Sequence, residues 1–427
     1  MPSLLLPPLR QRRHPVVRIF IATDFSMNQV HLANHKKLTS NERRRTALVA
    51  VAAVGFIAGA YALTGGELPD PARPVSLLLG AVLGFAFERG RFCFFCLYRD
   101  AFERRITRPL IAIVTALAVG AVGYALMFGL YLPNPKGEGL PPAAHISAVS
   151  VPLVAGAAAF GLGMVLSGAC ISGHLYRVGQ GYLRAIPALV GSLVGFGLGF
   201  FTWNTLYLEQ VSESPVLWLP RWLGYSGSLI VVLSVLAVVA YVLLRVDRSE
   251  DVPPTTGRLF ETLLVRRWSP VATGAVVGAV GVAAYLRSTP LGVTSQLSTI
   301  SRSYLDSRGM LPEVLHGIDM MRGCVAVVAS TVTNNGWLVI GFVVASFVAA
   351  LAAGNFKVQR PTIGNSVTAF VGGVLLGWGS LTALGCTVGV LLSGTQAFAV
   401  SGVVFLIVVT ATVGVGVRLG IHRWFGA

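Results

Sequence analysis

A motif centred on a cysteine occurs twice in this 427-residue chain and constrains its fold more than any other feature. Residues 161–181 have the sequence GLGMVLSGACISGHLYRVGQG, and residues 377–397 have the sequence GWGSLTALGCTVGVLLSGTQA, so that Cys170 and Cys386 stand 216 positions apart. Three glycines keep the same distance from the cysteine in both copies. In each copy an apolar run stops at small residues beside the cysteine. This pattern predicts two related halves, each containing a helix that is broken at a thiol.

The composition places the chain in a lipid bilayer. Hydrophobic residues make up 54% of the sequence and charged residues 12%, and the mean hydropathy is +0.72. Soluble domains carry about 25% charged residues. The 49 glycines suit closely packed membrane helices, because small residues allow two backbones to approach. We therefore predict an all-α polytopic membrane protein.

The sequence predicts about ten membrane-spanning helices, each requiring about 20 apolar residues. They are expected near residues 46–63, 75–88, 109–131, 150–168, 184–206, 227–245, 269–287, 335–353, 366–384 and 396–418.

The placement of the basic residues supports this count. With the N-terminal side called the inside, 26 of the 33 Lys and Arg residues fall on the inside and seven on the outside. Because cytoplasmic loops are enriched in Lys and Arg, this bias predicts that both termini lie in the cytoplasm. It also accounts for the net charge of +16. No basic groove with interleaved aromatic residues appears, so we expect no binding to nucleic acid.

The order of the expected spans divides the chain into five parts. Spans two to five and spans seven to ten form the two repeats, and an offset of five spans turns the second repeat upside down in the membrane. Residues 1–45 are expected to be a disordered basic tail, within which Met27 is an alternative start to Met1. The other parts are an additional N-terminal helix with an outer loop at 46–74, a first inverted repeat at 75–226, a linking helix with a cytoplasmic linker at 227–268, and a second inverted repeat at 269–427.

Two short segments occupy equivalent places after spans two and seven. Residues 88–102 contain Gly90, Cys93 and Cys96, and residues 289–300 contain Gly292 and hydroxyl side chains in place of cysteine. Each is too short to cross the bilayer, so we expect re-entrant half-helices buried in protein. The sequence favours a headgroup-anchoring role for the arginines of the first segment, which are Arg89, Arg91 and Arg99.

The candidate site consists of thiols and of the glycines that interrupt helices beside them. Breaks at matching positions of two halves indicate a transport site, so we expect Cys170 and Cys386 to face each other, with Cys93 toward the cytoplasmic exit. The glycines expected to support the breaks are Gly90, Gly168, Gly173, Gly292, Gly385 and Gly389. We expect no catalytic residue, no metal ion and no cofactor.

The chemistry of these residues favours a soft anion as the substrate. Few ionisable residues lie within the expected spans, which argues against a carboxylate relay or an arginine clamp at the centre of the membrane. Backbone N–H groups at half-helix starts can hold an anion. A thiol is a weak donor with a polarisable sulfur, which suits a sulfur-bearing anion and permits its release.

At these residues the chain resembles the YeeE/YedE family of bacterial inner-membrane sulfur-compound permeases. The segments that carry the resemblance are GRFCFFCLYRDAF (90–102), GLGMVLSGACISGHLYRVGQG (161–181), TPLGVTSQL (289–297) and LTALGCTVGVLLSG (381–394). The resemblance implies an hourglass-shaped protein with two inverted repeats. It also implies that Cys93, Cys170 and Cys386 relay thiosulfate along a narrow pathway by S–H···S hydrogen bonds. A cytoplasmic sulfur-carrier protein or sulfurtransferase is a candidate partner.

The sequence departs from the family in three places. Residues 1–70 add a tail and a helix, Cys96 forms a C-x-x-C pair with Cys93, and the long outer loop at 301–334 holds Cys324, for which we expect no role. The pair leaves an alternative open, because such a motif can lower a thiol pKa. In that alternative the protein is a membrane thiol–disulfide oxidoreductase using Cys93 and Cys96. A third hypothesis, a structural membrane anchor, explains neither the repeat nor the breaks.

Overall fold

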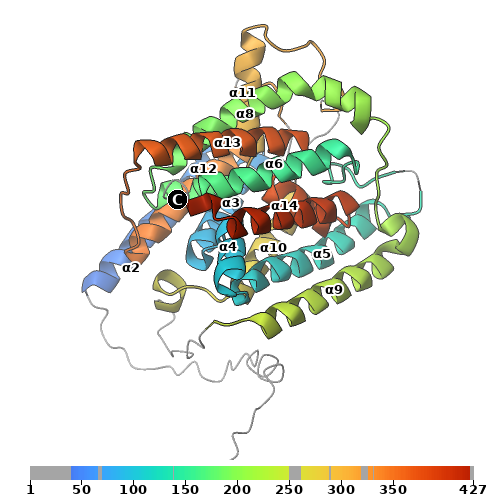
Figure 1. Ribbon diagram of the computed structural model, residues 1–427. Helices are drawn as coiled ribbons and strands as arrows, with labels where there is room; N and C mark the ends of the chain where they lie inside the picture. Colours follow the sequence, from blue (N-terminus) through green and yellow to red (C-terminus); the bar gives the residue numbers. More distant parts are fainter. Residues whose placement is uncertain are drawn as a thin grey trace, which may run out of the picture. The chain divides into compact units, whose positions relative to one another are not determined.

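The computed structural model describes residues 40–65, 70–137, 139–249, 261–287, 290–318, 326–329 and 331–423. The chain divides into two compact units, Met1–Arg44 and Arg45–Ala427. All but the last few residues of the first unit, and therefore most of the expected tail, lie outside the described residues, as does Cys324. The described elements are all helices (Figure 1). The described residues also form two isolated β-bridges but no strand. The prediction of an all-α membrane protein is confirmed.

The helices of the first half and of the linking region follow one another along the chain. They are α2 (Ser40–Ala62), α3 (Ala72–Gly90), α4 (Phe94–Arg104), η2 (Arg108–Leu110), α5 (Ile111–Tyr131), α6 (Val151–Ser167), α7 (Ile171–Gly179), α8 (Ala185–Leu206), η3 (Tyr207–Val211), α9 (Pro220–Val246) and η4 (Glu261–Val265). The helices of the second half are α10 (Pro270–Arg287), α11 (Ser295–Ser307), α12 (Asn334–Ala353), α13 (Ile363–Thr382), η5 (Thr387–Gly394), α14 (Val400–Arg418) and η6 (Ile421–Arg423).

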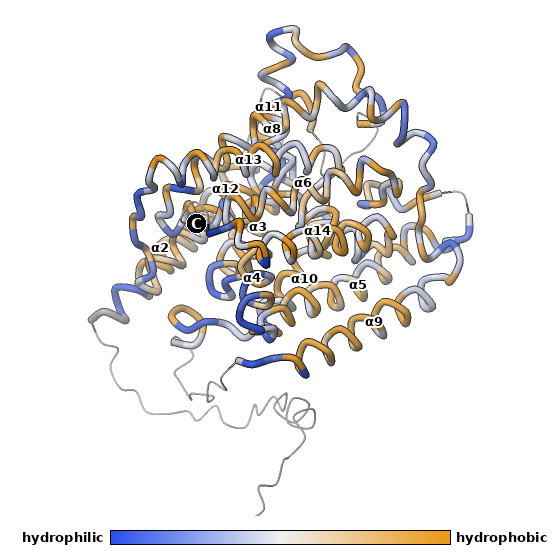
Figure 2. Tube along the Cα trace, viewed as in Figure 1, coloured by the Kyte–Doolittle hydropathy of each residue, from blue (hydrophilic) through white to orange (hydrophobic). Residues whose placement is uncertain are grey.

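Each of the ten stretches expected to span the membrane coincides with a helix. Within the described residues, eight helical stretches are long and apolar enough to cross a bilayer. The other two expected spans are α3, which carries Arg73, Glu88 and Arg89, and α10, whose apolar part is shorter. Figure 2 shows the long apolar course of α9, whose large side chains are mostly exposed. Exposing an apolar surface of this size to water is unfavourable, so its surroundings are expected to be lipid.

Glycines bring helices of the two halves into backbone contact. In α3, a Cβ atom on Gly80 would lie 2.0 Å from the carbonyl oxygen of Leu338 in α12. In α10, a Cβ atom on Gly274 would lie 2.2 Å from the carbonyl oxygen of Ala112 in α5. Only glycine permits such an approach. The α3–α12 and α10–α5 pairs are therefore packed in the same way, with the halves exchanged.

The helices that lead to the two cysteines cross each other at equivalent glycines. A Cβ atom on Gly156 of α6 would lie 2.8 Å from the carbonyl oxygen of Gly379 in α13. A Cβ atom on Gly372 of α13 would lie 2.8 Å from the carbonyl oxygen of Gly163 in α6. These positions are related by the same 216-residue offset as the cysteines. The crossing of α6 and α13 is thus self-complementary, because each helix places equivalent glycines against the other.

Other helix contacts also occur as matched pairs, in which each helix of one pair is replaced by its counterpart from the other half. The corresponding helix pairs are α8–α13 with α14–α6, α4–α14 with α11–α8, α7–α8 with η5–α14, and α7–α12 with η5–α5. In Figure 1, α13, α6 and α14 run side by side, in agreement with these contacts.

The two segments expected to re-enter the membrane are short helices. α4 has 11 residues and α11 has 13. At about 1.5 Å per residue, neither reaches across a hydrocarbon core of about 30 Å. Four residues of α4 and five of α11 are buried, so both lie against protein.

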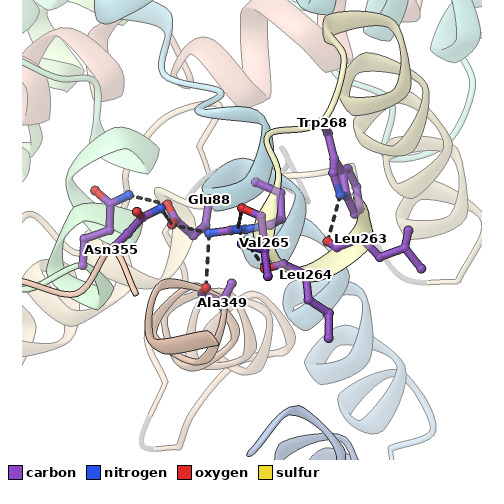
Figure 3. Close-up of polar contacts among 9 residues, drawn as sticks. Glu88, Leu263, Leu264, Val265, Trp268, Ala349 and Asn355 are labelled. Carbon is purple, nitrogen blue, oxygen red and sulfur yellow. Dashed lines mark hydrogen bonds and ion pairs between the residues drawn. The ribbon is translucent and has the colours of Figure 1, made fainter. Parts of the chain in front are cut away.

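The prediction that Arg89 anchors to lipid headgroups is wrong. Arg89 is 2% exposed and forms an ion pair with Glu88 at 2.8 Å. It also donates to the carbonyl oxygens of Leu264, Val265 and Ala349 (Figure 3). A buried guanidinium needs these acceptors, and they tie the end of α3 to η4 and α12. Of the other two arginines, Arg91 is exposed and Arg99 pairs with Asp100.

Candidate functional site

The first helix break is built at Gly168. Helix α6 ends at Ser167, whose hydroxyl donates to the carbonyl oxygens of Gly163 at 2.7 Å and Ala169 at 3.0 Å. Gly168 then takes a φ of +84°, a left-handed conformation that favours glycine. The chain turns, and Cys170 becomes the N-cap of α7. The predicted interruption of residues 161–181 at the thiol is therefore present.

The Cys170 side chain acts as the cap of α7. Its Sγ atom accepts from the Gly173 backbone N–H at 3.4 Å and contacts the Ser172 hydroxyl at 3.2 Å. The thiol thus lies at a helix start, where backbone N–H groups and the helix dipole favour negative charge.

The second break has a related geometry with a different residue in the left-handed position. Helix α13 ends at Thr382, Leu384 has a φ of +59°, and Gly385 has a φ of +152°. Cys386 is the N-cap of η5, which is a short π-helix. Leu384 corresponds to Gly168, and a left-handed leucine costs about 1–2 kcal/mol. Short π-helical segments are frequent at functional sites.

Cys93 is brought next to Cys170 by the loop between α3 and α4. Arg91 has a φ of +48°, which reverses the chain so that Cys93 becomes the N-cap of α4. A Cβ atom on Gly173 would lie 3.0 Å from Cys93 Sγ and 3.4 Å from Cys170 Sγ. The Cys93 thiol also interacts with those of Cys170 and Cys96. Three cysteines of the first half therefore form a continuous series.

The series continues into the second half through hydroxyl groups. The Cys170 side chain interacts with the Thr387 hydroxyl, and Thr387 directly follows Cys386. The Cys386 thiol is within electrostatic range of the buried Thr294 hydroxyl, which has no hydrogen-bond partner among the described residues. Thr294 is the N-cap of α11, the place that Cys93 has in α4. Each half therefore contributes two N-cap side chains to this buried series of thiols and hydroxyls.

The three predicted pathway cysteines are fully buried. Cys93 and Cys170 are 0% exposed and Cys386 is 1% exposed. An anion that reaches them leaves bulk water, so donors in the protein must replace its hydration. The thiols, the hydroxyls and the N–H groups at the starts of α7 and η5 are the donors available there.

The six glycines expected to support helix breaks differ in where they lie relative to the helices. Gly90 ends α3, Gly168 and Gly385 occur in the two breaks, and Gly292 lies in the buried segment before α11. Gly173 and Gly389 lie inside α7 and η5, so they are not themselves breaks.

One of the thiols contacts an arginine, although the sequence argued against an arginine clamp at the centre of the membrane. Arg177 in the last turn of α7 donates to Cys96 Sγ at 2.9 Å and to the carbonyl oxygen of Gly168 at 2.9 Å. The sequence contained a signal for this contact. Arg177 follows Cys170 by seven residues, which places both on one face of a helix, and the C-x-x-C spacing places Cys96 one turn beyond Cys93.

Glu88 also holds the C-terminal end of α7. Its carboxylate accepts from Gln180, the residue that ends α7, and from Asn355 at 3.3 Å (Figure 3). Together with Arg89 it joins the ends of α3, α7 and α12. Within the described residues, no three His, Cys, Asp or Glu side chains gather closely enough to hold a metal ion.

Buried thiols at matched breaks in a multi-pass helical protein define a class, that of membrane transporters with discontinuous helices. The comparisons with known proteins agree with this class. The model of the sulphur-transport family matches residues 89–416. The chain belongs to this family, and it is a transporter rather than an enzyme.

Similar proteins include two thiosulfate transporters, both called TsuA. The one from Escherichia coli is 26% identical over 73% of this chain and 84% of its own length. The one from Spirochaeta thermophila is 28% identical over 76% of this chain and 92% of its own length. The probable transporter YedE from Escherichia coli is 26% identical over 38% of each chain. The family predicted from the cysteine motifs is confirmed.

Proposed function

We propose that the protein imports thiosulfate, or a related sulfur-containing anion, through a narrow pathway lined by Cys93, Cys170 and Cys386. The observation that carries this proposal is that the side chains of Cys93, Cys170 and Thr387 interact in succession, and that Thr387 is next to Cys386 in the chain. The similarity to two thiosulfate transporters over most of the chain supports the choice of substrate.

The thiols fit this role because their interactions are weak and directional. A neutral thiol donates one S–H hydrogen bond, and its polarisable sulfur packs against the terminal sulfur of thiosulfate. Successive weak donors allow the anion to pass from one position to the next. Strong binding at any one position would hold the anion and slow its release.

We further propose that the two halves are inverted repeats in an hourglass-shaped bacterial inner-membrane protein with cytoplasmic termini. The exchange of helix contacts between the halves supports the repeat. The 26-to-7 distribution of basic residues supports the orientation. In this orientation Cys93 is on the cytoplasmic side of Cys170, where a sulfur-carrier protein or sulfurtransferase would receive the anion.

The oxidoreductase alternative is not favoured by the family, whose similar members are transporters. Its best feature, the Cys93–Cys96 pair, has another explanation, because Cys96 Sγ is an acceptor for Arg177. Cys96→Ser keeps that acceptor and removes the redox pair. We expect this variant to retain thiosulfate uptake, whereas an oxidoreductase would lose its activity.

Uptake of radiolabelled thiosulfate by cells that lack their own transporter tests the proposal. We expect uptake that depends on this chain and that excess unlabelled thiosulfate suppresses, with sulfite and sulfide tested as competitors. Competition that favours sulfite or sulfide over thiosulfate would reassign the substrate. Absence of uptake of any of these sulfur anions would refute the function.

A further inference from the structure

Two guanidinium groups converge beside the break that follows α6. Arg177 donates through Nη1 to the carbonyl oxygen of Gly168 at 2.9 Å, and Arg184 donates through Nη2 to the carbonyl oxygen of Leu166 at 3.1 Å. A Cβ atom on Gly168 would lie 4.0 Å from Nη1 of each arginine, and apart from its chain neighbours no other atom is as close. Among the described residues, neither arginine forms an ion pair with a carboxylate.

Both arginines retain hydrogen-bond donors. A guanidinium group carries five N–H donors. The Nε atom of Arg184 is buried without a hydrogen-bond partner, and its Thr368 contact is long at 3.5 Å. Two neighbouring cations without a carboxylate are unfavourable in a partly buried site. An anion that accepts from both would relieve their repulsion.

A buried histidine lies beside them. His174 is 2% exposed, and in the part of the chain that the structure describes neither ring nitrogen has a hydrogen bond of good geometry, although the ring lies near the Ala169 backbone. It is within electrostatic range of both Arg177 and Arg184. Buried polar side chains are nearly always hydrogen-bonded, so an imidazole without a well-formed hydrogen bond beside two cations indicates a ligand.

The cluster occurs at one end of the fold only. The positions that correspond in the second half to Cys96, His174, Arg177 and Arg184 are Leu297, Val390, Ser393 and Val400. If the cluster were needed to fold a half, its counterpart would be expected in the other half. Its absence there indicates a task specific to one mouth of the pathway.

The cluster lies where the buried thiols meet the surface. Cys93 and Cys170 are fully buried, whereas Cys96, Arg177 and Arg184 are partly exposed. Cys96 interacts with Cys93, so the cluster is continuous with the line of thiols.

We propose that Arg177, Arg184, His174 and Cys96 form a second binding site, for a sulfur oxyanion at one mouth of the pathway. This inference rests on the proposed function and adds to it a site outside the three pathway thiols. The oxygen atoms of the anion accept from the two guanidinium groups, and its terminal sulfur faces Cys96. Cys96 Sγ accepts from Arg177, which leaves its own S–H available to donate to the ligand.

The site matches a divalent anion with one sulfur end. Two arginines balance a charge of −2, and their planar donors suit tetrahedral oxyanions. Sulfate satisfies the arginines but offers no sulfur to the thiol. We therefore expect sulfate to compete at this site more weakly than thiosulfate does.

The test compares transport kinetics at the two faces of the membrane. Intact cells present one face of the full-length protein, and inverted membrane vesicles present the other. The KM for radiolabelled thiosulfate is measured at both faces for wild type, Arg184→Gln and Arg177→Gln. We expect each variant to raise KM about tenfold at one face and to change it less than about twofold at the other, because a charge-assisted contact is lost at one mouth only.

Three comparisons keep the result interpretable. Arg360→Gln removes a charge from an exposed residue and should leave KM unchanged at both faces. Arg184→Lys and Arg177→Lys keep the charge without the planar donors, and should show intermediate KM values even if the glutamine variants do not fold. An unchanged KM at both faces, or an equal rise at both, overturns the site while wild-type uptake leaves the proposed function intact. Lack of wild-type uptake refutes the proposed function instead.

Discussion

Gly173 and Cys93 touch across two short helices, so that a Cβ atom on Gly173 would lie 3.0 Å from Cys93 Sγ. The same Cβ atom would lie 3.4 Å from Cys170 Sγ. The contact between the two thiols therefore depends on the absence of a side chain at position 173. This relation connects the break after α6 to the half-helix α4.

Gly173→Ala is expected to reduce uptake by separating these sulfur atoms. Alanine normally stabilises a helix by about 1 kcal/mol relative to glycine, but overpacking costs about 1–3 kcal/mol. We expect a net loss of stability and a several-fold lower uptake rate, measured with radiolabelled thiosulfate. Gly55→Ala is the control, because its Cβ atom would meet nothing within 4 Å. Uptake at the wild-type rate by Gly173→Ala would contradict the close packing of the thiols.

Gly372→Ala tests the crossing of α6 and α13. Its Cβ atom would lie 2.6 Å from the backbone nitrogen of Ser167, so the helices must separate. We expect a lower melting temperature in detergent, with a loss of about 1–3 kcal/mol. Gly364→Ala in the same helix meets nothing within 4 Å and should melt as the wild type does. Equal melting temperatures for both variants would rule out the crossing as described.

Glu88→Gln is expected to destabilise the junction of α3, α7 and α12. The variant leaves Arg89 buried without its counter-charge, which costs about 3–5 kcal/mol. The measurement is thermal unfolding of the purified protein. Glu209→Gln, at an exposed glutamate, should have no effect. If the two variants unfold at the same temperature, the ion pair has no role in holding this junction.

Asp247 gives the junction after α9 a pH dependence. Burial raises the pKa of this carboxyl, but hydrogen bonds from Ser249, Arg108 and Thr107 outweigh that effect and lower it. Because the pKa is lower in the folded state, the stabilisation is complete above the unfolded value of about 4 and is lost as the pH falls through the folded value. Asp247→Asn should therefore melt below wild type at pH 7, with a difference that shrinks in acid. A constant difference would exclude this explanation.

Much of the fold could be predicted because its signals are local or repeated. Apolar runs and charge placement located the helices, and the matched motifs around Cys170 and Cys386 located both breaks. Gly168 was recognisable because its left-handed φ favours glycine. The break at Leu384 lacks that signal, and only the repeat offset points to it.

The contacts that could not be predicted join residues far apart in the chain. Arg89 follows an apolar run in the way that a headgroup anchor does, and only η4 and the end of α12 supply its acceptors. Arg177 and Arg184 are ordinary residues of a cytoplasmic loop by sequence. Their convergence at Gly168 depends on how the chain turns after α7.

Uptake of radiolabelled thiosulfate by Cys170→Ala and by Cys386→Ala tests the central claim most directly. Both substitutions remove a buried thiol and little volume, so each variant should reach the membrane and melt near the wild-type temperature. Cys324→Ala is the matched control, at a thiol for which no role is expected. The account predicts that Cys170→Ala and Cys386→Ala each abolish uptake while the control retains it. Full uptake by both central variants would contradict a pathway lined by these thiols.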